Sequence, residues 1–575
     1  MIKKILPILL TLFLSIRISS AEDVNFLLIT IDTWRADYIS VSGSKKVETP
    51  FLDMMAREGI YLKYVDTPCP MTTPSHASIL TGLYPKNHGI RDNRNFKLQD
   101  NIITLATLFK EKGYKTYAVV SGIPLLKRYG LNKDFDIYDD EDLEKEDTLE
   151  NAIKGSLKSG EQISERALKI LQNEKEKTFL WMHFYDPHYP YKPPAMFDSL
   201  KDPYAGEVAY VDWVLKDFFE KLLKDNKKWM VITTGDHGED LNEHNEETHG
   251  ILLYNTTRKV PLILWDQSKK VKTFGKGAKS LIDIFPTIVE IFDLRNTNCD
   301  GESLFKDTQR ALFSETYFPL CFGANPGFSF KKEDFVFIKH GTSNEVYKDD
   351  FKEGKNFYSK NKDFVKEALR EIKNYSKEDL KPNLKLSEEE LKTLSSLGYI
   401  SSSSSLSSNK ITECDLREVA KDFTSYTQKG WEVAEKKNPQ IIIDEYDRLI
   451  KKYPYAPLLH CDKSGILIRM KRYEEAYKEC NLCVMLDPQN SVASSNFANL
   501  LAMRGKFREA EKYYLISLTI DEKQPITHYN LGMIYFEKLN NKSGAVKHLK
   551  RFLELDPQNP NSQKAKKILK ELQKE

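Results

Sequence analysis

Short apolar runs alternate with amphipathic segments through residues 25–400. The runs NFLLITID (25–32) and KWMVITTGD (228–236) each end in an acidic residue, and TLATLFKEKGYKTYAVVSG (104–122) has the pattern of a helix followed by a strand. Apolar runs of this length are typical of parallel strands that are buried on both faces. The pattern therefore predicts an α/β fold with a mostly parallel central sheet flanked by helices.

The pattern changes at residues 391–409, LKTLSSLGYISSSSSLSSN, where a serine run leaves almost nothing apolar to bury. Such a composition predicts a flexible linker, and hence a domain boundary. Beyond it, four residues recur at spacings of 34, 34 and 35, and three of them end helix-like stretches: Tyr453, Asp487, Asp521 and Asp556. MLDPQNS at 485 also returns as ELDPQNP at 554. The period and these phrases resemble tetratricopeptide repeats, so we expect an all-α array of about four units from residue 415, followed by a polar capping helix.

The first residues have the order of a secretory signal peptide. Two lysines precede an apolar run, Ile5 to Ile16, and small residues follow at Ser19 and Ala21. This order predicts cleavage after Ala21, removal of residues 1–21 and a periplasmic or secreted protein. The alternative is an uncleaved membrane anchor, although the run is shorter than the roughly 20 residues that a span needs.

Charge and cysteine content change this picture little. Charged residues make up 30% of the chain, but the formal net charge is only +2, so nothing indicates a nucleic-acid-binding patch. Among the seven cysteines, Cys480 and Cys483 form a C-x-x-C that could bind metal or act in redox chemistry. Its strongly helical surroundings favour packing between helices instead.

Histidines gather where the predicted strands end. Seven of the 11 lie between His76 and His249, in three clusters with acids and hydroxyls nearby. In an open parallel sheet the loops after the strands share one edge, so distant segments can converge on one site. Asp32, Asp236 and His237 offer oxygen and nitrogen ligands for a divalent ion such as zinc or manganese.

A candidate nucleophile lies in a separate segment. Thr72 comes just before Pro74, a residue suited to the first turn of the predicted helix PSHASILTG. At a helix N-terminus, free backbone N–H groups and the helix dipole favour a tetrahedral oxyanion. A hydroxyl coordinated to a divalent metal loses its proton near neutral pH. Nucleophile, metal and anion site are therefore compatible with one location.

These segments together resemble the alkaline phosphatase superfamily. TTPSHASILTGLYPKNHGIRDN (72–93) is similar to the nucleophile segment of its nucleotide pyrophosphatase/phosphodiesterase branch, and the frame around it resembles sulfatase-type hydrolases in LLYNTTRKVPLILW, DIFPT, DGESLF and LSSLGYI. The resemblance implies a catalytic domain over residues 22–398, a Ser-rich linker over 399–412 and a tetratricopeptide repeat domain over 413–575.

The sequence departs from true sulfatases at three places. Sulfatases use a cysteine or serine in C/S-x-P-x-R, matured to formylglycine, whereas alignment on Pro74 puts Thr72 at the nucleophile and His76 at the arginine. Asp32 is followed by threonine rather than by a second acid, and Asp236 is followed by histidine rather than by asparagine. All three departures favour a phosphate ester over a sulfate ester.

Carried over by position, the resemblance assigns the site residues. It implies one metal bound by Asp32, Thr72, Asp236 and His237, with Thr72 as the attacking alkoxide. It implies a second metal bound by Asp186, His188 and His249, although relatives with one metal use a histidine on the substrate, and His188 or His183 could have that role. Asn93 and the backbone N–H of Thr73 would hold the oxyanion. The expected cofactors are one or two divalent ions, zinc first, with manganese, magnesium or calcium as alternatives.

The function that follows is an exported, metal-dependent phosphoesterase, working on a diester or phosphonate-type substrate through a phosphothreonine at Thr72. A sulfatase with an unmodified threonine and a phospho-group transferase are the enzyme alternatives. The repeats are expected to bind a protein or peptide partner, and a non-catalytic scaffold is the alternative of a different class.

Overall fold

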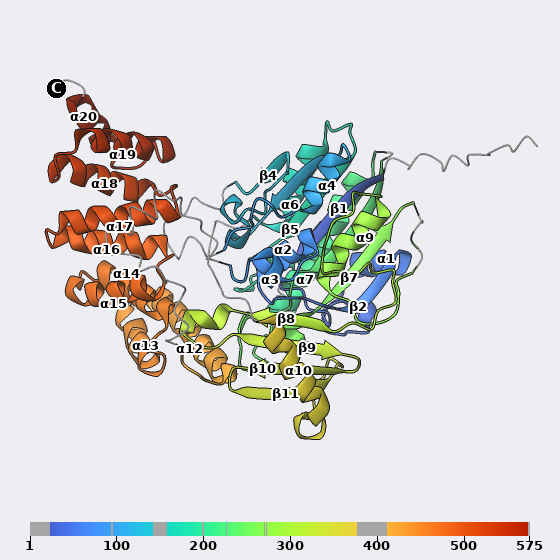
Figure 1. The fold of residues 1–575 in the computed structure, drawn as a ribbon. Helices are drawn as coiled ribbons and strands as arrows, with labels where there is room; N and C mark the ends of the chain where they lie inside the picture. Colours follow the sequence, from blue (N-terminus) through green and yellow to red (C-terminus); the bar gives the residue numbers. More distant parts are fainter. Residues whose placement is uncertain are drawn as a thin grey trace, which may run out of the picture.

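The computed structural model describes residues 24–572 except 94–95, 142–157, 198–199, 226, 269–270, 272, 377–410 and 437. Figure 1 shows an α/β domain beside a stacked array of helices that ends at the C-terminus. The signal peptide at 1–21 and most of the linker at 399–412 lie outside the described residues, so the predicted domain limits stay predictions. No helix in the described ranges combines the length and the apolar character that a membrane crossing requires.

The central sheet has seven strands in the order β2-β7-β6-β1-β5-β3-β4. The strands are β1 (Val24–Ile31), β2 (Ile60–Asp66), β3 (Lys115–Val120), β4 (Ile137–Asp139), β5 (Thr178–Phe184), β6 (Lys228–Gly235) and β7 (Lys259–Asp266). β6, β1, β5, β3 and β4 run parallel. At one edge, β7 pairs antiparallel with β6, and β2 pairs antiparallel with β7. The predicted α/β class with a mostly parallel sheet is confirmed.

Helices cover both faces of this sheet. Alternate side chains of β1 point to opposite faces, so Phe26 and Leu28 pack with α2 (Thr72–Thr81), α4 (Leu105–Glu111) and α9 (Ile284–Ile291). Leu27 and Ile29 pack with the helices on the other face, which are α1 (Pro50–Glu58), α6 (Gly160–Leu171) and α7 (Pro203–Leu222). Burying each such side chain contributes about 1.5–3 kcal/mol. The apolar run of β1 therefore lies at the centre of two cores.

A second sheet, which the sequence patterns did not predict, follows the α/β unit. Its order is β11-β10-β9-β8, all antiparallel, and one face packs on α10 (Lys362–Tyr375). The strands are β8 (Leu312–Thr316), β9 (Gly327–Lys332), β10 (Phe335–His340) and β11 (Ser343–Lys348). Tight turns join the last three strands, with Glu333 and Gly341 at φ 52° and 63°.

Short helical turns complete the α/β unit. They are α3 (Pro85–His88), α8 (Asn255–Arg258), and the 3₁₀ turns η1 (Ser40–Ser42), η2 (Ile123–Leu125), η3 (Lys127–Tyr129), η4 (Ala195–Phe197), η5 (Leu281–Asp283), η6 (Phe318–Phe322) and η7 (Tyr358–Lys360).

The C-terminal region is a stack of helix pairs. Its helices are α12 (Leu416–Lys436), α13 (Pro439–Lys452), α14 (Pro457–Arg469), α15 (Tyr473–Leu486), α16 (Ser491–Met503), α17 (Phe507–Ile520), α18 (Pro525–Glu537), α19 (Lys542–Leu555) and α20 (Ser562–Leu572). Asp487, Asp521 and Asp556 are the C-cap residues of α15, α17 and α19, which explains their regular spacing. The all-α array and its capping helix are confirmed.

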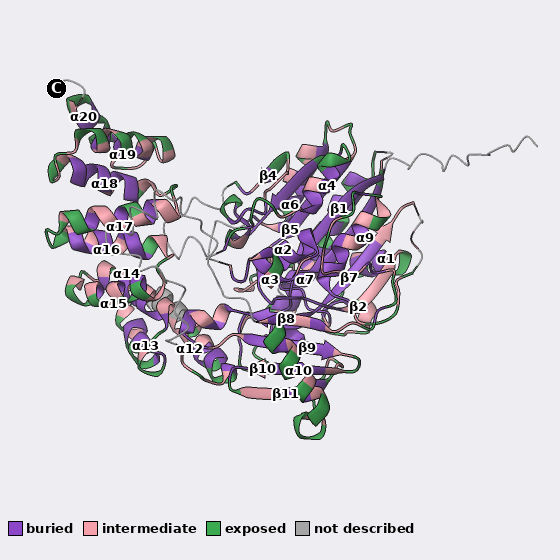
Figure 2. Ribbon diagram, in the orientation of Figure 1, coloured by how far each residue is buried: buried purple, intermediate pink, exposed green. Residues whose placement is uncertain are grey.

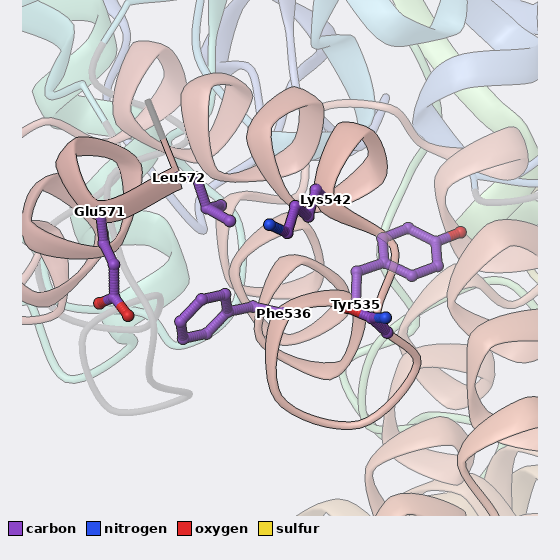
Figure 3. Close-up of a pocket in the computed structure, with 6 residues that line it drawn as sticks. Tyr535, Phe536, Lys542, Glu571 and Leu572 are labelled. Atoms are coloured by element: carbon purple, nitrogen blue, oxygen red, sulfur yellow. The ribbon is translucent and has the colours of Figure 1, made fainter. Parts of the chain in front are cut away.

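Two local features of the array were not predicted. Cys483 forms a disulfide with Cys461 and thereby links α14 to α15, whereas Cys480 stays a free thiol in the core. A hollow lies where α18, α19 and α20 meet, lined by Tyr535, Phe536, Asn540, Lys542, Glu571 and Leu572 (Figure 3). The hollow belongs to the capping end of the array and not to the sheet edge that carries the histidine clusters.

The array and the α/β domain share one hydrophobic core. Leu416 and Val419 of α12 and Tyr453 after α13 are buried in the same cluster as Ile251 and Phe322 of the α/β domain. Figure 2 shows buried stretches both on the strands of the second sheet and on the first helices of the array. The first helix pair of the array is therefore packed directly against the α/β domain.

Candidate functional site

The site begins where two neighbouring parallel strands end. β1 and β6 pair with Ile31 opposite Gly235, so Asp32 and the pair Asp236-His237 emerge side by side. Ligand atoms of these three residues all lie within 4.8 Å of one another. His237 Nε2 is 3.5 Å from Asp32 Oδ1 and 3.4 Å from Asp236 Oδ2. We call these three residues the Asp-Asp-His cluster.

The inward-facing atoms of the cluster have no partner. Asp32 Oδ1, Asp236 Oδ2 and His237 Nε2 are buried and make no hydrogen bond to the described residues. The other oxygen of Asp236 accepts hydrogen bonds from the backbone N–H groups of Thr33 (3.2 Å) and His237 (2.8 Å), which fixes the direction of the carboxylate. His237 Nδ1 donates to the carbonyl of Gly238 at 3.0 Å, which leaves the Nε2 lone pair facing the acids.

Electrostatics also favours a cation here. Burial raises the pKa of Asp32, and burial together with the Asp32 charge raises the pKa of Asp236 to about 7. Two adjacent carboxylates and an imidazole lone pair repel one another unless a cation or proton lies between them. Two oxygens and one nitrogen form a donor set that suits zinc or manganese. The residues present therefore fit a divalent ion.

Helix α2 brings Thr72 to this cluster. Thr72 is the first residue of the helix and is 2% exposed. Ser75 Oγ donates to the carbonyl of Asp236 at 2.7 Å, and His76 Nδ1 lies 3.6 Å from Asp236 Oδ2. The first turn of α2 is thus docked on Asp236, as a nucleophile on this helix would require.

The predicted oxyanion site is arranged differently from expectation. The backbone N–H of Thr73 donates to Asn93 Oδ1 at 2.9 Å, so it is already used within the protein. Because Oδ1 must accept that hydrogen bond, the amide orientation of Asn93 is fixed and its Nδ2 remains as the donor. Of this predicted pair, the Asn93 side chain is the group that can reach an anion.

The hydroxyl of Thr30 forms hydrogen bonds with three aromatic side chains beside the cluster. Burial lowers the pKa of His76 to about 3, and its Nδ1 donates to the carbonyl of Thr72 at 2.7 Å. His76 Nε2 must then accept from the Thr30 hydroxyl, 2.9 Å away. Thr30 Oγ1 in turn accepts from Trp181 Nε1 (3.0 Å) and from His183 Nδ1 (3.0 Å).

This bonding determines the tautomer of His183. With its Nδ1 donating, the neutral ring has its lone pair on Nε2, which is buried, has no hydrogen-bond partner and lies 3.6 Å from Asp32 Oδ2. Burial lowers the pKa of His183 to about 4, which keeps the ring neutral. Thr30 therefore presents an imidazole lone pair to the edge of the Asp-Asp-His cluster.

Two further histidines extend the site. The His249 ring lies 4.3 Å from the His237 ring and 5.2 Å from the His188 ring, measured between centroids. His249 Nδ1 donates to Glu239 Oε1 at 2.9 Å, and His188 Nδ1 lies 2.6 Å from the carbonyl of Tyr189. Each contact leaves the Nε2 lone pair available, and burial lowers the pKa of both rings to about 4.

Asp186 is not brought together with these histidines. Its carboxyl group accepts from the backbone N–H of Gly160, and its charged neighbours are Glu161 and Glu207 rather than the cluster. Among the described residues, Asp186, His188 and His249 do not form a group with ligand atoms within 4.8 Å. The buried acid that does contact His249 is Glu239, two residues after His237 in DHGED. Its place in the loop directly after β6 was the available signal.

The remaining residues of the opening segment have structural surroundings. His88 bonds to Ser78 Oγ at 3.0 Å and accepts from the N–H of Ile90 at 3.1 Å. Cys69 is fully buried, and burial raises the pKa of its thiol well above the usual range. A buried protonated thiol is a poor nucleophile, so Cys69 does not compete with Thr72.

Comparison with known proteins gives two family matches. Residues 24–294 match the sulfatase family model, and residues 459–490 and 526–559 match a tetratricopeptide repeat model. An arylsulfatase of Clostridium perfringens is 26% identical over 366 residues, which cover 48% of this chain and 74% of that protein. The multifunctional alkaline phosphatase superfamily protein PehA of Trinickia caryophylli is 24% identical over 394 residues, covering 49% and 76%.

A solved structure shows the same fold. The phosphonate monoester hydrolase of Agrobacterium radiobacter aligns with a TM-score of 0.51 at 19% identity, covering 61% of this chain and 94% of that chain.

Proposed function

The chain carries a sulfatase-family domain of the alkaline phosphatase superfamily, followed by tetratricopeptide repeats, and we propose that this domain cleaves phosphate esters through a covalent phosphothreonine at Thr72. One observation carries the proposal. Thr72 begins a buried helix whose first turn is bonded to Asp236 through Ser75. A threonine held in this way next to a cation-binding cluster has the position of a nucleophile.

Each group of site residues has a separate role in this proposal. We assign one divalent ion to Asp32, Asp236, His237 and Thr72, and a second, if present, to the side of His188 and His249. A bound divalent ion would lower the pKa of the Thr72 hydroxyl and offset negative charge on the substrate. Asn93 Nδ2 would donate to a phosphoryl oxygen, because its Oδ1 is held by Thr73.

The reaction proceeds in two displacements. Thr72 Oγ forms a bond to phosphorus while the bond to the leaving oxygen breaks, and the alcohol departs with the proton that Thr72 gave up. Water then attacks phosphorus, the bond to Thr72 Oγ breaks, and Thr72 regains a proton. An alcohol in place of water in the second step would make the enzyme a transferase, which is the alternative with the same intermediate.

The charge of the site favours a singly charged ester. The charged side chains with the largest effect on Asp32 and Asp236 are other acids and histidines. His76, at the position where sulfatases have arginine, is a buried neutral ring. A phosphodiester or a phosphonate monoester carries one negative charge and suits this arrangement better than a phosphate monoester, which carries two near neutral pH.

The test is a substrate panel with matched Thr72 variants. We expect zinc- or manganese-dependent cleavage of bis-nitrophenyl phosphate or a phenylphosphonate ester, a loss on the order of 10⁴ or more in kcat for Thr72→Ala, and partial activity for Thr72→Ser. Acid quenching during turnover should trap phosphate on the peptide that contains Thr72. Full diester activity in Thr72→Ala would refute the proposal.

Sulfate ester hydrolysis is the second candidate. The family match and the arylsulfatase relative favour it, and sulfate esters are also singly charged. Nitrophenyl sulfate in the same panel separates the two. Dominant sulfatase activity that is lost in Thr72→Ala, in protein made without any formylglycine-generating step, would replace phosphate by sulfate and keep the nucleophile.

Export and partner binding are proposals of the same kind. The signal-peptide pattern supports export, and the disulfide between Cys461 and Cys483 is typical of an oxidising compartment. Tetratricopeptide arrays bind extended or helical protein segments, so we propose a protein or peptide partner for the repeats. If the folded protein hydrolyses no substrate of the panel and binds no metal, the non-catalytic scaffold becomes the better assignment.

A further inference from the structure

The loop after β6, residues 239–250, carries both Glu239 and His249, and we call it the His249 loop. Leu241, Asn242 and Asn245 have φ values of 55°, 66° and 63°, so the loop makes tight turns in the left-handed region. Two backbone hydrogen bonds of 2.8 Å close it, from Asp240 N to Thr248 O and from Asn242 N to Glu246 O. Its tip is therefore a compact turn whose outward side faces the first helix of the array.

The ends of the loop are held by the α/β domain. The carboxylate of Glu246 is buried and accepts from the N–H groups of Ile251 (2.7 Å) and Leu252 (3.0 Å). Thr316 of β8 donates its hydroxyl to the carbonyl of Gly250. These bonds anchor the Glu246 side chain and the end of the loop, but none of them involves the backbone of Asn245 or Glu247.

Helix α12 holds that turn. Thr424 Oγ1 accepts from the N–H of Glu247 at 2.9 Å and donates to the carbonyl of Asn245 at 3.2 Å. Thr427 Oγ1 lies 3.0 Å from Glu247 Oε2 and can donate to it. The Thr424 hydroxyl thus satisfies one donor and one acceptor of the loop backbone, only two residues before His249.

Helix α12, which carries these hydroxyls, packs against the α/β domain. The Phe423 ring lies 5.3 Å from Phe318 and 5.5 Å from Phe322, measured between centroids. Phe318 also lines the space beside Gly250, where a Cβ would come within 3.3 Å of its ring. The same aromatic group therefore contacts both α12 and the residue after His249.

We propose that Thr424 is a positioning residue for His249, so that the first helix of the repeat domain completes the hydrolase site. The proposal rests on the role given to His249 under the proposed function, but the hydrogen bonds themselves are independent of it. Without Thr424, the 245–247 turn would lose its two backbone contacts to α12, and His249 would sample positions away from His237 and Glu239.

The test uses the full chain and three matched variants. Thr424→Val removes the hydroxyl at constant shape, and Thr424→Ser restores it. Ser425→Ala is the control, because Ser425 Oγ donates to Glu445 Oε1 on the array side of the same helix, at 2.9 Å. Two readouts need no turnover: amide hydrogen exchange in peptides covering 242–250, and exchange of the His249 ring C–H, which reports its surroundings. The third is kcat and KM on the best substrate of the panel.

For Thr424→Val we expect about fivefold faster amide exchange in the 242–250 peptides, a changed ring exchange rate at His249, and a kcat lowered about fivefold with little change in KM. Thr424→Ser and Ser425→Ala should match the unmodified protein. If Thr424→Val does not fold, Thr427→Val is expected to show the same changes to a smaller extent.

Unchanged exchange in a folded Thr424→Val, or equal effects from Ser425→Ala, would overturn the proposal. Faster amide exchange with an unaltered His249 ring would also overturn it, because the helix would then hold the loop without positioning the histidine. A protein that hydrolyses no substrate would count against the proposed function alone, since both exchange measurements remain decisive.

Discussion

At the scale of single residues, the site is a set of lone pairs directed at one small volume. The inward oxygens of Asp32 and Asp236 and the Nε2 atoms of His237 and His183 are buried, and none has a hydrogen-bond partner in the described part of the chain. Buried polar atoms without partners are rare in native proteins and need an explanation. A divalent ion explains most of them at once, and proton binding is its competitor.

This competition predicts a pH dependence of metal affinity. Burial and the Asp32 charge raise the pKa of Asp236 from 3.8 to about 7, and only the deprotonated carboxylate binds metal. Below pH 7 we expect manganese affinity to fall about tenfold per pH unit, for one displaced proton. Titration calorimetry between pH 5 and 8 measures this, and Asp236→Asn, in which residue 236 has no proton to displace, should show a weaker dependence. A constant affinity over this range in the unmodified protein would contradict it.

The raised pKa of Asp236 has the opposite effect on the metal-free protein, whose stability falls as the pH rises. Because the folded state holds a proton on Asp236 that the unfolded chain releases, this contribution is complete below about pH 4 and is lost as the pH rises through about 7. We therefore expect the gain in melting temperature on adding manganese to be larger at pH 8 than at pH 5.

The Thr30 hydroxyl predicts a large effect of an isosteric change. Thr30→Val would leave His76 Nε2, His183 Nδ1 and Trp181 Nε1 buried without partners. Since each such group costs about 1–3 kcal/mol, we expect a loss of about 3 kcal/mol in the free energy of unfolding after partial relaxation. Urea unfolding measures it. Thr30→Ser keeps the hydroxyl and should lose less than half as much, and an equal loss in both variants would contradict the role of the hydroxyl.

The sequence could predict the residues that follow strand ends, but not their partners. Asp32, Asp236 and His237 meet as expected because β1 and β6 are parallel neighbours. Asp186 also follows a strand, yet its side chain turns toward Gly160, a direction set by packing that no local pattern encodes. Glu239 and Thr30 gain their importance from contacts with residues far away in the sequence, so neither stood out.

At the scale of elements, helix α2 shows how a whole segment is used to place one residue. All ten of its residues are buried, so the helix has no solvent face and its periodicity gives little signal in the sequence. Its position is set at both ends: by the contacts of Ser75 and His76 at the start, and by Gly82 at the end, with φ 69°.

Gly82 therefore predicts a measurable cost for a single methyl group. A Cβ there would lie 2.9 Å from the Cβ atoms of both Cys299 and Phe285, in addition to the strain of a left-handed backbone. We expect Gly82→Ala to lower the free energy of unfolding by about 3 kcal/mol. Gly43→Ala is the matched control, because Gly43 has a φ of 87° but nothing within 4 Å of its Cβ position. It should cost about 1 kcal/mol, and equal costs for the two would refute the packing argument.

The second sheet is the element that the pattern of polar and apolar residues did not predict. β8 to β11 are five or six residues long, and polar and apolar positions do not alternate clearly along all of them. Their core with α10 contains residues such as Phe330 and Phe337, and the contacts between these residues and the helix are seen only in the folded structure.

At the scale of the whole molecule, the shared core joins two units that the sequence separates by a serine run. Phe322 is fully buried and lies 5.5 Å from the Phe423 ring and 6.2 Å from the Tyr453 ring. A flexible linker in the sequence therefore does not imply independent domains. Only the contacts show that α12 and α13 pack both on the α/β domain and on the rest of the array.

This core predicts coupled unfolding. We expect Phe322→Ala to cost about 3–5 kcal/mol and to shift two probes together. The probes are tryptophan fluorescence, dominated by the five tryptophans before residue 266, and helical circular dichroism, dominated by the array. Leu549→Ala, in the separate cluster at the far end of the array, should move only the dichroism midpoint. Separate midpoints already present in the unmodified protein would contradict the coupling.

The order of strands in the central sheet has a consequence for biosynthesis. β1 is the first strand to be made, yet both of its partners, β5 and β6, come later, and β6 starts about 200 residues after it. At ribosomal speeds of about 5–20 residues per second, roughly 10–40 s pass before β6 exists. Until β5 is made, about 150 residues after β1, an eight-residue stretch that is entirely apolar except for two positions has neither edge covered, and one edge stays open until β6 follows. The nascent chain should therefore depend on a holding chaperone, and the demand should end only when residue 235 has emerged.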